Sequence, residues 1–244
     1  MDQLKKFLNQ REASIKDLGL RENLNEEAIR FMKDTGEFKY TYNFDWLGLP
    51  IIQFPQDMVA IQELIWKTKP DIIIETGVAR GGSLMLSASI LHLLNEKGKV
   101  IGVDIDIRPH NRSAIESHPL AFRIELVQGS SIDQLTLDQV KKYIHPDKKV
   151  MVILDSNHTH DHVLKELDIY SPLVTKGCYL VVMDTGIDNM PADYFPDRPW
   201  GEGNNPKTAV HQFLKSDKRF EIDKDIPNKL LITVAPDGYL KCLK

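Results

Sequence analysis

Short, continuous runs of apolar residues recur along most of the chain, and segments with helical spacing separate them. Five such runs, rich in Val and Ile, lie at residues 71–77, 100–106, 123–129, 150–155 and 179–184. The helical patterns lie at about residues 57–69, 83–95, 111–117, 133–144 and 160–170. Asp57 is the expected cap of the first helix. Apolar runs without polar alternation are typical of a parallel sheet covered on both faces, so the pattern predicts a doubly wound α/β domain.

The two ends of the chain differ from this pattern. Residues 1–36 have helical spacing, and residues 37–56 are rich in aromatic residues and turns. We interpret residues 1–56 as an N-terminal extension that packs over the main domain, covers a substrate or contacts another copy of the chain. At the other end, KLLITVAPDGYLKCLK predicts two strands that turn at residues 236–238. The expected fold is therefore a Rossmann-like, mostly parallel sheet in residues 57–244 that ends in an antiparallel hairpin.

Composition narrows the classes of partner. The formal net charge is −4, so no basic field favours nucleic acid. No apolar run reaches the roughly 20 residues of a membrane helix. The N-terminus has no apolar signal segment, and two cysteines, Cys178 and Cys242, are too few for a disulfide framework. We expect a cytoplasmic protein that binds neither nucleic acid nor a membrane.

A glycine-rich loop, ETGVARGGS at residues 75–83, follows the first apolar run. Small residues between a strand and a helix let a ligand approach the backbone and the free N–H groups of the helix. The loop lacks the G-x-G-x-x-G spacing of a dinucleotide site, and the acid Glu75 at its start suits a cationic ligand instead. The loop favours the methionine end of S-adenosylmethionine, and an ordinary tight turn is the alternative.

Two further strand ends carry polar groups suited to the rest of that donor. Asp104 ends the second run, about 20 residues beyond the loop, where a carboxylate can accept both ribose hydroxyls. Asp106 is the weaker candidate for this role. Residues 128–131 end the third run, where an adenine ring would lie. Acids at strand ends also occur as helix caps, which is the structural alternative.

The densest group of reactive side chains is DSNHTHDH at residues 155–162. Asp155 and Asp184 end the fourth and fifth runs, so their carboxylates can converge on one Mg²⁺ ion that lowers the pKa of a substrate hydroxyl. His158 could then remove the hydroxyl proton. HTHDH also resembles the H-x-H-x-D-H signature of metallo-β-lactamase-like hydrolases, but it is one residue short. We interpret His160 and His162 as solvated or packed against a helix.

Seven stretches together resemble the cephalosporin hydroxylase-like family of class I S-adenosylmethionine-dependent methyltransferases, which includes rhamnosyl and macrolide-sugar O-methyltransferases. They lie at residues 46–57, 75–83, 100–112, 128–133, 154–167, 179–185 and 203–214. The resemblance implies homo-oligomers, metal ligation by Asp155 and Asp184, and His158 as the general base. The donor-binding residues that it implies are Glu75, Gly77, Arg80, Gly81, Ser83, Asp104 and Ser130.

One residue departs from the family pattern. Members with a defined Mg²⁺ site carry Glu-Asp where this chain has Met183-Asp184. A thioether is a poor ligand for a hard cation. The ion would therefore bind weakly, recruit Thr185 or water, or be absent.

Residues 186–206 form a long segment rich in Pro, Gly and aromatic residues. Loops of this length are often functional, so we expect it to cover the substrate with Tyr194, Phe195 and Trp200 as apolar walls, or to serve as a structural or oligomer contact. The whole sequence predicts an S-adenosylmethionine-dependent O-methyltransferase that acts on a small molecule, at a hydroxyl of a sugar or secondary metabolite. A donor-binding protein without turnover and a nicotinamide-dependent oxidoreductase are the alternatives.

Overall fold

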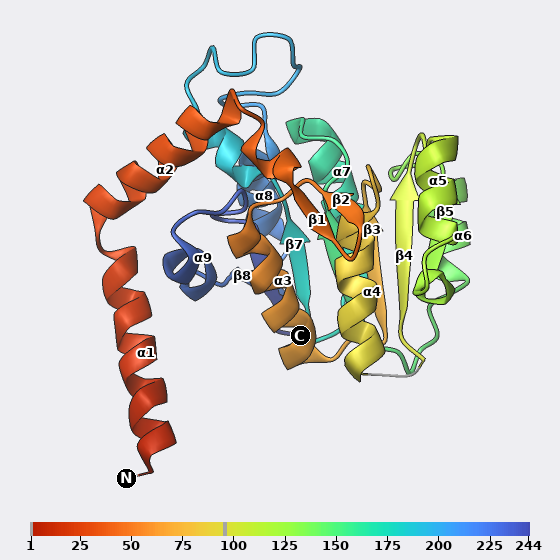
Figure 1. Ribbon diagram of the computed structural model, residues 1–244, viewed down its shortest axis with the longest axis horizontal. Coiled ribbons are helices and arrows are strands. Elements are labelled where there is room, and N and C mark those ends of the chain that lie inside the picture. The colour runs from red at the N-terminus through yellow and green to blue at the C-terminus, as the bar shows by residue number, and fades with distance from the viewer. Residues whose placement is uncertain (1, 95–96) are drawn as a thin grey trace.

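The computed structural model describes residues 2–94 and 97–244. Among these residues, seven strands form the main sheet in the order β5-β4-β3-β6-β7-β9-β8 (Figure 1). The first five in the chain are parallel: β3 (Ile72–Thr76), β4 (Lys99–Asp104), β5 (Ile124–Gln128), β6 (Val150–Leu154) and β7 (Tyr179–Val182). The last two are β8 (Phe220–Ile222) and β9 (Tyr239–Cys242), and β9 runs antiparallel to both β7 and β8. The predicted fold class is confirmed.

Helices cover both faces of the sheet. In Figure 1, α3 and α4 lie in front of the strands, and α7 and α8, which pack on each other, lie behind them. The helices of this part are α3 (Pro55–Thr68), α4 (Gly82–Leu94), α5 (Pro109–Glu116), α6 (Gln134–Lys141), α7 (His160–Tyr170), α8 (Pro206–Ser216) and α9 (Asp225–Leu230). The predicted end of α4 near residue 95 lies outside the described residues. Every residue of β3 and β6 is buried, which explains why both strands lack polar alternation.

The N-terminal residues form two helices and a small hairpin, α1 (Gln3–Gly19), α2 (Glu22–Gly36), β1 (Phe44–Trp46) and β2 (Leu49–Ile51). α1 stands at the margin of the molecule in Figure 1 and packs mainly against α9. The hairpin packs on α4, where the Trp46 Nε1–H donates to Ser89 Oγ at 3.1 Å. No helix in the described part of the chain has the length and apolarity needed to cross a membrane.

Two predictions about local structure are wrong. The antiparallel partner of β9 is β8, and residues 231–235 form no strand, although a turn precedes β9 at the predicted place. α3 begins at Pro55 with Phe54 as its N-cap, so Asp57 does not cap the helix. Both errors have one cause. Asp57 is fully buried and binds the segment at residues 233–234, which is therefore packed against α3 instead of paired in the sheet.

Asp57 holds three donors from the C-terminal part of the chain. Its carboxylate accepts hydrogen bonds from the Thr233 hydroxyl, from the Val234 N–H at 3.0 Å and from the Tyr239 hydroxyl at 2.8 Å. Burial raises the pKa of Asp57 to about 6, although these hydrogen bonds oppose the shift. The carbonyl of Val234 then accepts from the Gly186 N–H at 2.8 Å. Asp57 thus links α3 to the turn that follows β7.

Asp57→Ala should lower the free energy of unfolding by roughly 3 kcal/mol, because three donors at the buried site lose their acceptor. The measurement is urea unfolding at pH 5, below the folded pKa of about 6, where removal of the buried charge does not offset the lost hydrogen bonds. Asp45→Ala, which removes an exposed acid from β1, is the control. Equal midpoints for the two variants would contradict this account of the Asp57 contacts.

Candidate active site

The strand order reverses between β3 and β6, so the loops after these two strands diverge and leave room for a ligand. The backbone is tightly packed at this point. Gly77 has a φ of +92°, and a Cβ atom on it would lie 2.0 Å from the carbonyl oxygen of Asp155. Gly81 also has a positive φ, and a Cβ there would lie 2.4 Å from Ile115 Cγ1. Both predicted glycines are therefore required by the geometry of the loop.

A cavity of about 540 Å³ lies at these strand ends. Gly77, Asp104, Asp155, His158 and Asp184 line it, together with Thr41, Tyr42, Ile52, Gln53, Ala79, Ser156, Met183, Ile187, Phe195, Arg198, Trp200 and Val234. A smaller neighbouring pocket is lined by residues 77–83 with Gln53 and Asp155. The structure therefore brings the glycine-rich loop and the predicted catalytic residues to one place.

Glu75 lies behind the glycine-rich loop and is only 1% exposed. The Ser83 hydroxyl donates a hydrogen bond to Glu75 Oε1, while Oε2 has no partner among the described residues. Burial raises the pKa of Glu75 to about 7, and the bond from Ser83 only partly opposes this. A buried acid without a positively charged partner favours the binding of a cation in the neighbouring pocket at residues 77–83. Its role in donor binding stays a prediction.

Asp104 lines the cavity and also shapes the loop. Its Oδ2 accepts from the Val78 N–H at 2.8 Å, and its Oδ1 accepts from the Asp106 N–H at 3.0 Å. Each carboxylate oxygen can accept a further bond, so Asp104 keeps capacity for ribose hydroxyls. Asp106, the weaker candidate for the ribose contact, is exposed, and its Oδ2 lies 3.9 Å from Arg108 Nε.

Two other predicted donor-binding residues are not part of the wall of the 540 Å³ cavity, although Arg80 lines the smaller neighbouring pocket. Arg80 is exposed, with its Nη1 at 3.4 Å from His110 Nε2. Ser130 is half-buried and is not part of the cavity wall. The loop after β6 contributes Ser156 to that wall instead, and the sequence analysis did not single out this residue.

Two residues on α7 hold Ser156: Glu166, which the sequence did not single out, and His162, which we interpreted as solvated or packed against a helix. The Ser156 hydroxyl donates to Glu166 Oε1 at 2.7 Å and lies 3.3 Å from His162 Nε2. His162 lies 3.1 Å from Ser131 Oγ as well, so it joins the loops after β5 and β6. Helical spacing of four between His162 and Glu166 was the available signal, because it puts both side chains on one face of α7.

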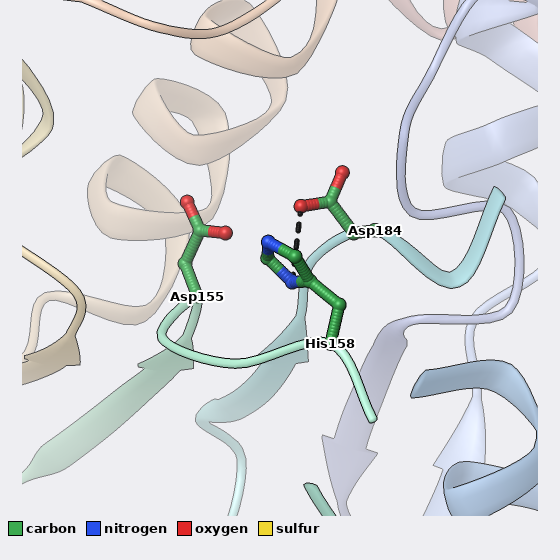
Figure 2. A group of neighbouring side chains, drawn as sticks. All are labelled: Asp155, His158 and Asp184. Carbon is green, nitrogen blue, oxygen red and sulfur yellow. Dashed lines mark ion pairs between the residues drawn. The ribbon is translucent and has the colours of Figure 1, made fainter. Parts of the chain in front are cut away.

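Figure 2 shows Asp155 at the end of β6, Asp184 after β7 and the imidazole of His158 between them. His158 Nδ1 lies 3.3 Å from Asp184 Oδ2. Each of the three residues offers one ligand atom, and these atoms lie within 4.8 Å of one another. Shielding from water, and then the negative charges of Asp184 and Glu75, raise the pKa of Asp155 well above its usual range. Two carboxylates in this setting fit a hard divalent cation.

The neighbouring residues limit the alternatives for the metal site. Met183 is buried, the Thr185 hydroxyl accepts from the Asp237 N–H at 3.4 Å, and His158 is the third residue in the group that the two acids form. His160 packs between α7 and α8, with Nδ1 at 2.8 Å from Thr208 Oγ1. Within the described residues, neither His160 nor His162 joins a group that could hold a metal. The geometry therefore gives no support to a hydrolase-type site.

Residues 186–206 close one side of the cavity. The Trp200 ring meets His158 edge to face, with 4.7 Å between centroids, and Phe195 also lines the wall. Tyr194 instead points to α2, where its hydroxyl donates to the Lys33 carbonyl at 3.1 Å. Two of the three predicted aromatic walls therefore face the cavity, and the third binds the extension.

Comparison with known proteins identifies the chain. The family described as rhamnosyl O-methyltransferase/CmcI matches residues 38–243. The chain belongs to this family. Rhamnosyl O-methyltransferase from Mycobacterium tuberculosis is 30% identical over 200 residues, which are 80% of this chain and 76% of that protein. The Mycobacterium leprae protein of the same name is 30% identical over 198 residues, which are 80% of this chain and 81% of that one.

Solved structures with the same fold agree with this assignment. A CmcI structure named Mg-SAM has a TM-score of 0.58 at 20% identity and covers 83% of this chain and 78% of its own. An O-methyltransferase from Bacillus cereus in complex with SAH has a TM-score of 0.54 at 15% identity, with 92% of each chain covered. The predicted class is confirmed: this member of the rhamnosyl O-methyltransferase/CmcI family is an S-adenosylmethionine-dependent O-methyltransferase with a small-molecule acceptor.

The buried Glu75 predicts a pH dependence of stability. Its pKa is about 7 in the folded protein against 4.5 ordinarily, so the folded state binds the proton more tightly. Its contribution to the free energy of unfolding is therefore present at low pH and is lost as the pH rises from 4.5 to about 7.

Glu75→Gln should accordingly be more stable than wild type by about 3 kcal/mol at pH 8 and equal to it at pH 4. The measurement is denaturant unfolding of the protein without ligands across this range. Glu221→Gln, a change of an exposed acid, is the control. Parallel stability curves for Glu75→Gln and wild type would show that Glu75 is not protonated by burial.

Asp104→Ala should weaken S-adenosylmethionine binding roughly 100-fold, because hydrogen bonds from two hydroxyls to a carboxylate are lost. Calorimetric titration measures the affinity. Asp106→Ala, next to it on the same loop, should bind the donor as wild type does. If the two variants behave alike, the ribose contact of Asp104 is refuted.

Proposed function

We propose that the protein transfers the methyl group of S-adenosylmethionine to a hydroxyl group of a sugar, with His158 as the general base. The observation that carries the proposal is the group formed by Asp155, His158 and Asp184 on the wall of the cavity, next to the glycine-rich loop. The sugar acceptor is supported by the relatives, which are named rhamnosyl O-methyltransferases.

The donor would lie along the strand ends from β3 to β5. Asp104 would accept the ribose hydroxyls, and the residues around Gly77 and Ser83 would surround the methionine end. The sulfonium and ammonium groups of the donor carry positive charge into a region of buried acids, which include Glu75 and Asp155. This charge complementarity supports the proposed position of the donor.

His158 and Asp184 form a pair suited to proton removal. Asp184 Oδ2 lies 3.3 Å from His158 Nδ1, so Nδ1 can donate to the carboxylate and leave Nε2 unprotonated for the acceptor hydroxyl. The hydroxyl proton moves to Nε2 as the oxygen attacks the methyl carbon. The C–O bond forms and the C–S bond breaks, so the products are the methyl ether, protonated His158 and S-adenosylhomocysteine.

Asp155 and Asp184 are the residues that would hold Mg²⁺. The ion, when bound, would lower the pKa of the acceptor hydroxyl and offset the repulsion between the two acids. Asp184 has a second oxygen for this purpose, since only Oδ2 faces His158. His158 itself would bind the proton rather than the metal.

The proposal includes a cytoplasmic location and assembly into homo-oligomers. On α1, Leu4 and Phe7 are 61% and 58% exposed, and none of the described residues of this helix is buried. An apolar strip of this kind supports a contact between copies of the chain.

His158→Ala should reduce the formation of S-adenosylhomocysteine by 10²- to 10⁴-fold, roughly the contribution of a general base. Titrations with S-adenosylmethionine and with Mg²⁺ should give wild-type affinities, in the micromolar range or about −8 kcal/mol for the donor. His160→Ala is the control in the same segment. Turnover is measured with rhamnosides and other glycosides as acceptors.

The outcomes separate the parts of the proposal. An active His158→Ala variant would remove His158 from the mechanism. If the His158→Ala variant loses both Mg²⁺ binding and activity, His158 acts as a metal ligand instead of as the base. Donor binding by wild type without turnover of any glycoside would refute sugar O-methylation.

A further inference from the structure

The charged side chains around the 540 Å³ cavity are separated by sign. Asp104, Asp155 and Asp184 all lie at strand ends, on the side of the donor. Arg198, on the loop at residues 186–206, is the only lysine or arginine among the described residues that line the cavity. Arg198 is therefore the one charge that the loop places on the described cavity wall, opposite the three acids of the strand ends, while the loop's own acids, Asp188, Asp193, Asp197 and Glu202, are not part of that wall.

Arg198 is an exposed residue on the loop that lines the cavity beside the proposed catalytic group. Its backbone N–H donates to the Phe195 carbonyl at 3.2 Å, and its guanidinium lies over the Trp200 ring at 5.2 Å from the centroid. Trp200 in turn contacts His158 at 4.7 Å. The Trp200 ring thus lies between the Arg198 guanidinium and His158, the residue that would receive the proton of the acceptor hydroxyl.

The guanidinium is available for a ligand. Among the described residues, no carboxylate lies within ion-pair distance of Arg198. The acid Asp188, in contrast, already has partners. Asp188 on the same loop accepts from Asn205 Nδ2 at 2.6 Å and lies 3.8 Å from Lys207. Five N–H donors arranged as a planar fork match the oxygens of a phosphate or a carboxylate.

The carboxylate of the donor does not account for Arg198. The pocket around residues 77–83, where the methionine end would lie, does not include it. A bound donor with its net positive charge, and Mg²⁺ on the two aspartates, would also offset the acids on the strand side. The loaded site would then attract an anion at Arg198.

We propose that Arg198 determines acceptor specificity by selecting sugars that carry a phosphate or a carboxylate close to the methylated hydroxyl. The inference rests on the proposed function, since it concerns the acceptor of the same reaction. Trp200 would contact the sugar ring, and Arg198 would bind the anionic group beyond it. Because the cation faces a cavity that opens to solvent, the anion remains partly hydrated and its effect depends on salt.

The test compares three acceptors at saturating donor: a nucleoside diphosphate sugar, a uronic acid glycoside and a neutral methyl glycoside. Wild type should show a higher kcat/KM for an anionic acceptor than for the neutral one, and the advantage should shrink as ionic strength rises. The two anionic acceptors distinguish phosphate from carboxylate as the recognised group.

Arg198→Gln should lower kcat/KM for the preferred anionic acceptor by roughly 10- to 100-fold and leave the neutral acceptor within about twofold of wild type. Arg198→Lys should retain part of the preference, because the charge remains without the planar fork. Arg11→Gln removes the same charge from the exposed surface of α1 and should leave all three acceptors unchanged.

A binding measurement adds a readout that does not need turnover. The nucleoside diphosphate alone should bind wild type loaded with S-adenosylhomocysteine and should bind Arg198→Gln at least about tenfold more weakly. Equal loss for neutral and anionic acceptors would make Arg198 a support for Trp200 and overturn the inference. Turnover of neutral glycosides without any anionic preference would also overturn it and leave the proposed function intact. No turnover of any of the three would instead refute the proposed function.

Discussion

Buried negative charge at the ends of the parallel strands is the constraint around which the site is organised. Asp155 lies close to Asp184, Glu75, Glu166 and Asp57, and all of these acids raise its pKa in addition to the loss of solvent. Among the described residues, only Ser83 donates a hydrogen bond to the Glu75 carboxyl group. Without a ligand these groups disfavour the ionised state, and a cationic donor or a divalent ion relieves the repulsion. The free energy that folding stores as repulsion is thereby recovered in binding.

Close backbone contacts fix the loops that carry these acids. Gly77 lets the loop after β3 pass directly over the carbonyl of Asp155, so the two loops are in close contact at this point. Asp57 holds Val234, whose carbonyl binds the Gly186 N–H just after Asp184. Asp184 itself has a φ of +59°, a left-handed conformation that its surroundings must support. Asp184, one of the two acids proposed to hold a metal, is therefore positioned by contacts from α3 and from the C-terminal part of the chain.

Donor and acceptor sides of the cavity are built differently. Strand ends and short loops form the side of the cavity that is proposed to bind the donor, and solved structures with 15–20% identity share the sheet that positions them. The proposed acceptor side includes the segment at residues 186–206, which Asn205 at the start of α8 fixes through its bonds to Asp188 and Gly201. A loop anchored at its base can change its exposed side chains at little cost to the sheet, which is where acceptor specificity can vary.

The sequence alone determined the order of the five parallel strands and the helices between them, the glycine-rich loop and the acids at strand ends, because apolar runs and their polar ends are local patterns. It also predicted the group of Asp155, His158 and Asp184, since parallel strands end at one edge of a sheet. It could not determine that Asp57 binds residues 233–234, that Ser156 is held from α7 or that Arg198 faces the cavity. Those contacts join positions between 10 and 177 residues apart or depend on an irregular loop. Only side-chain packing in three dimensions selects them, because no repeating pattern in the chain encodes which polar groups are buried together.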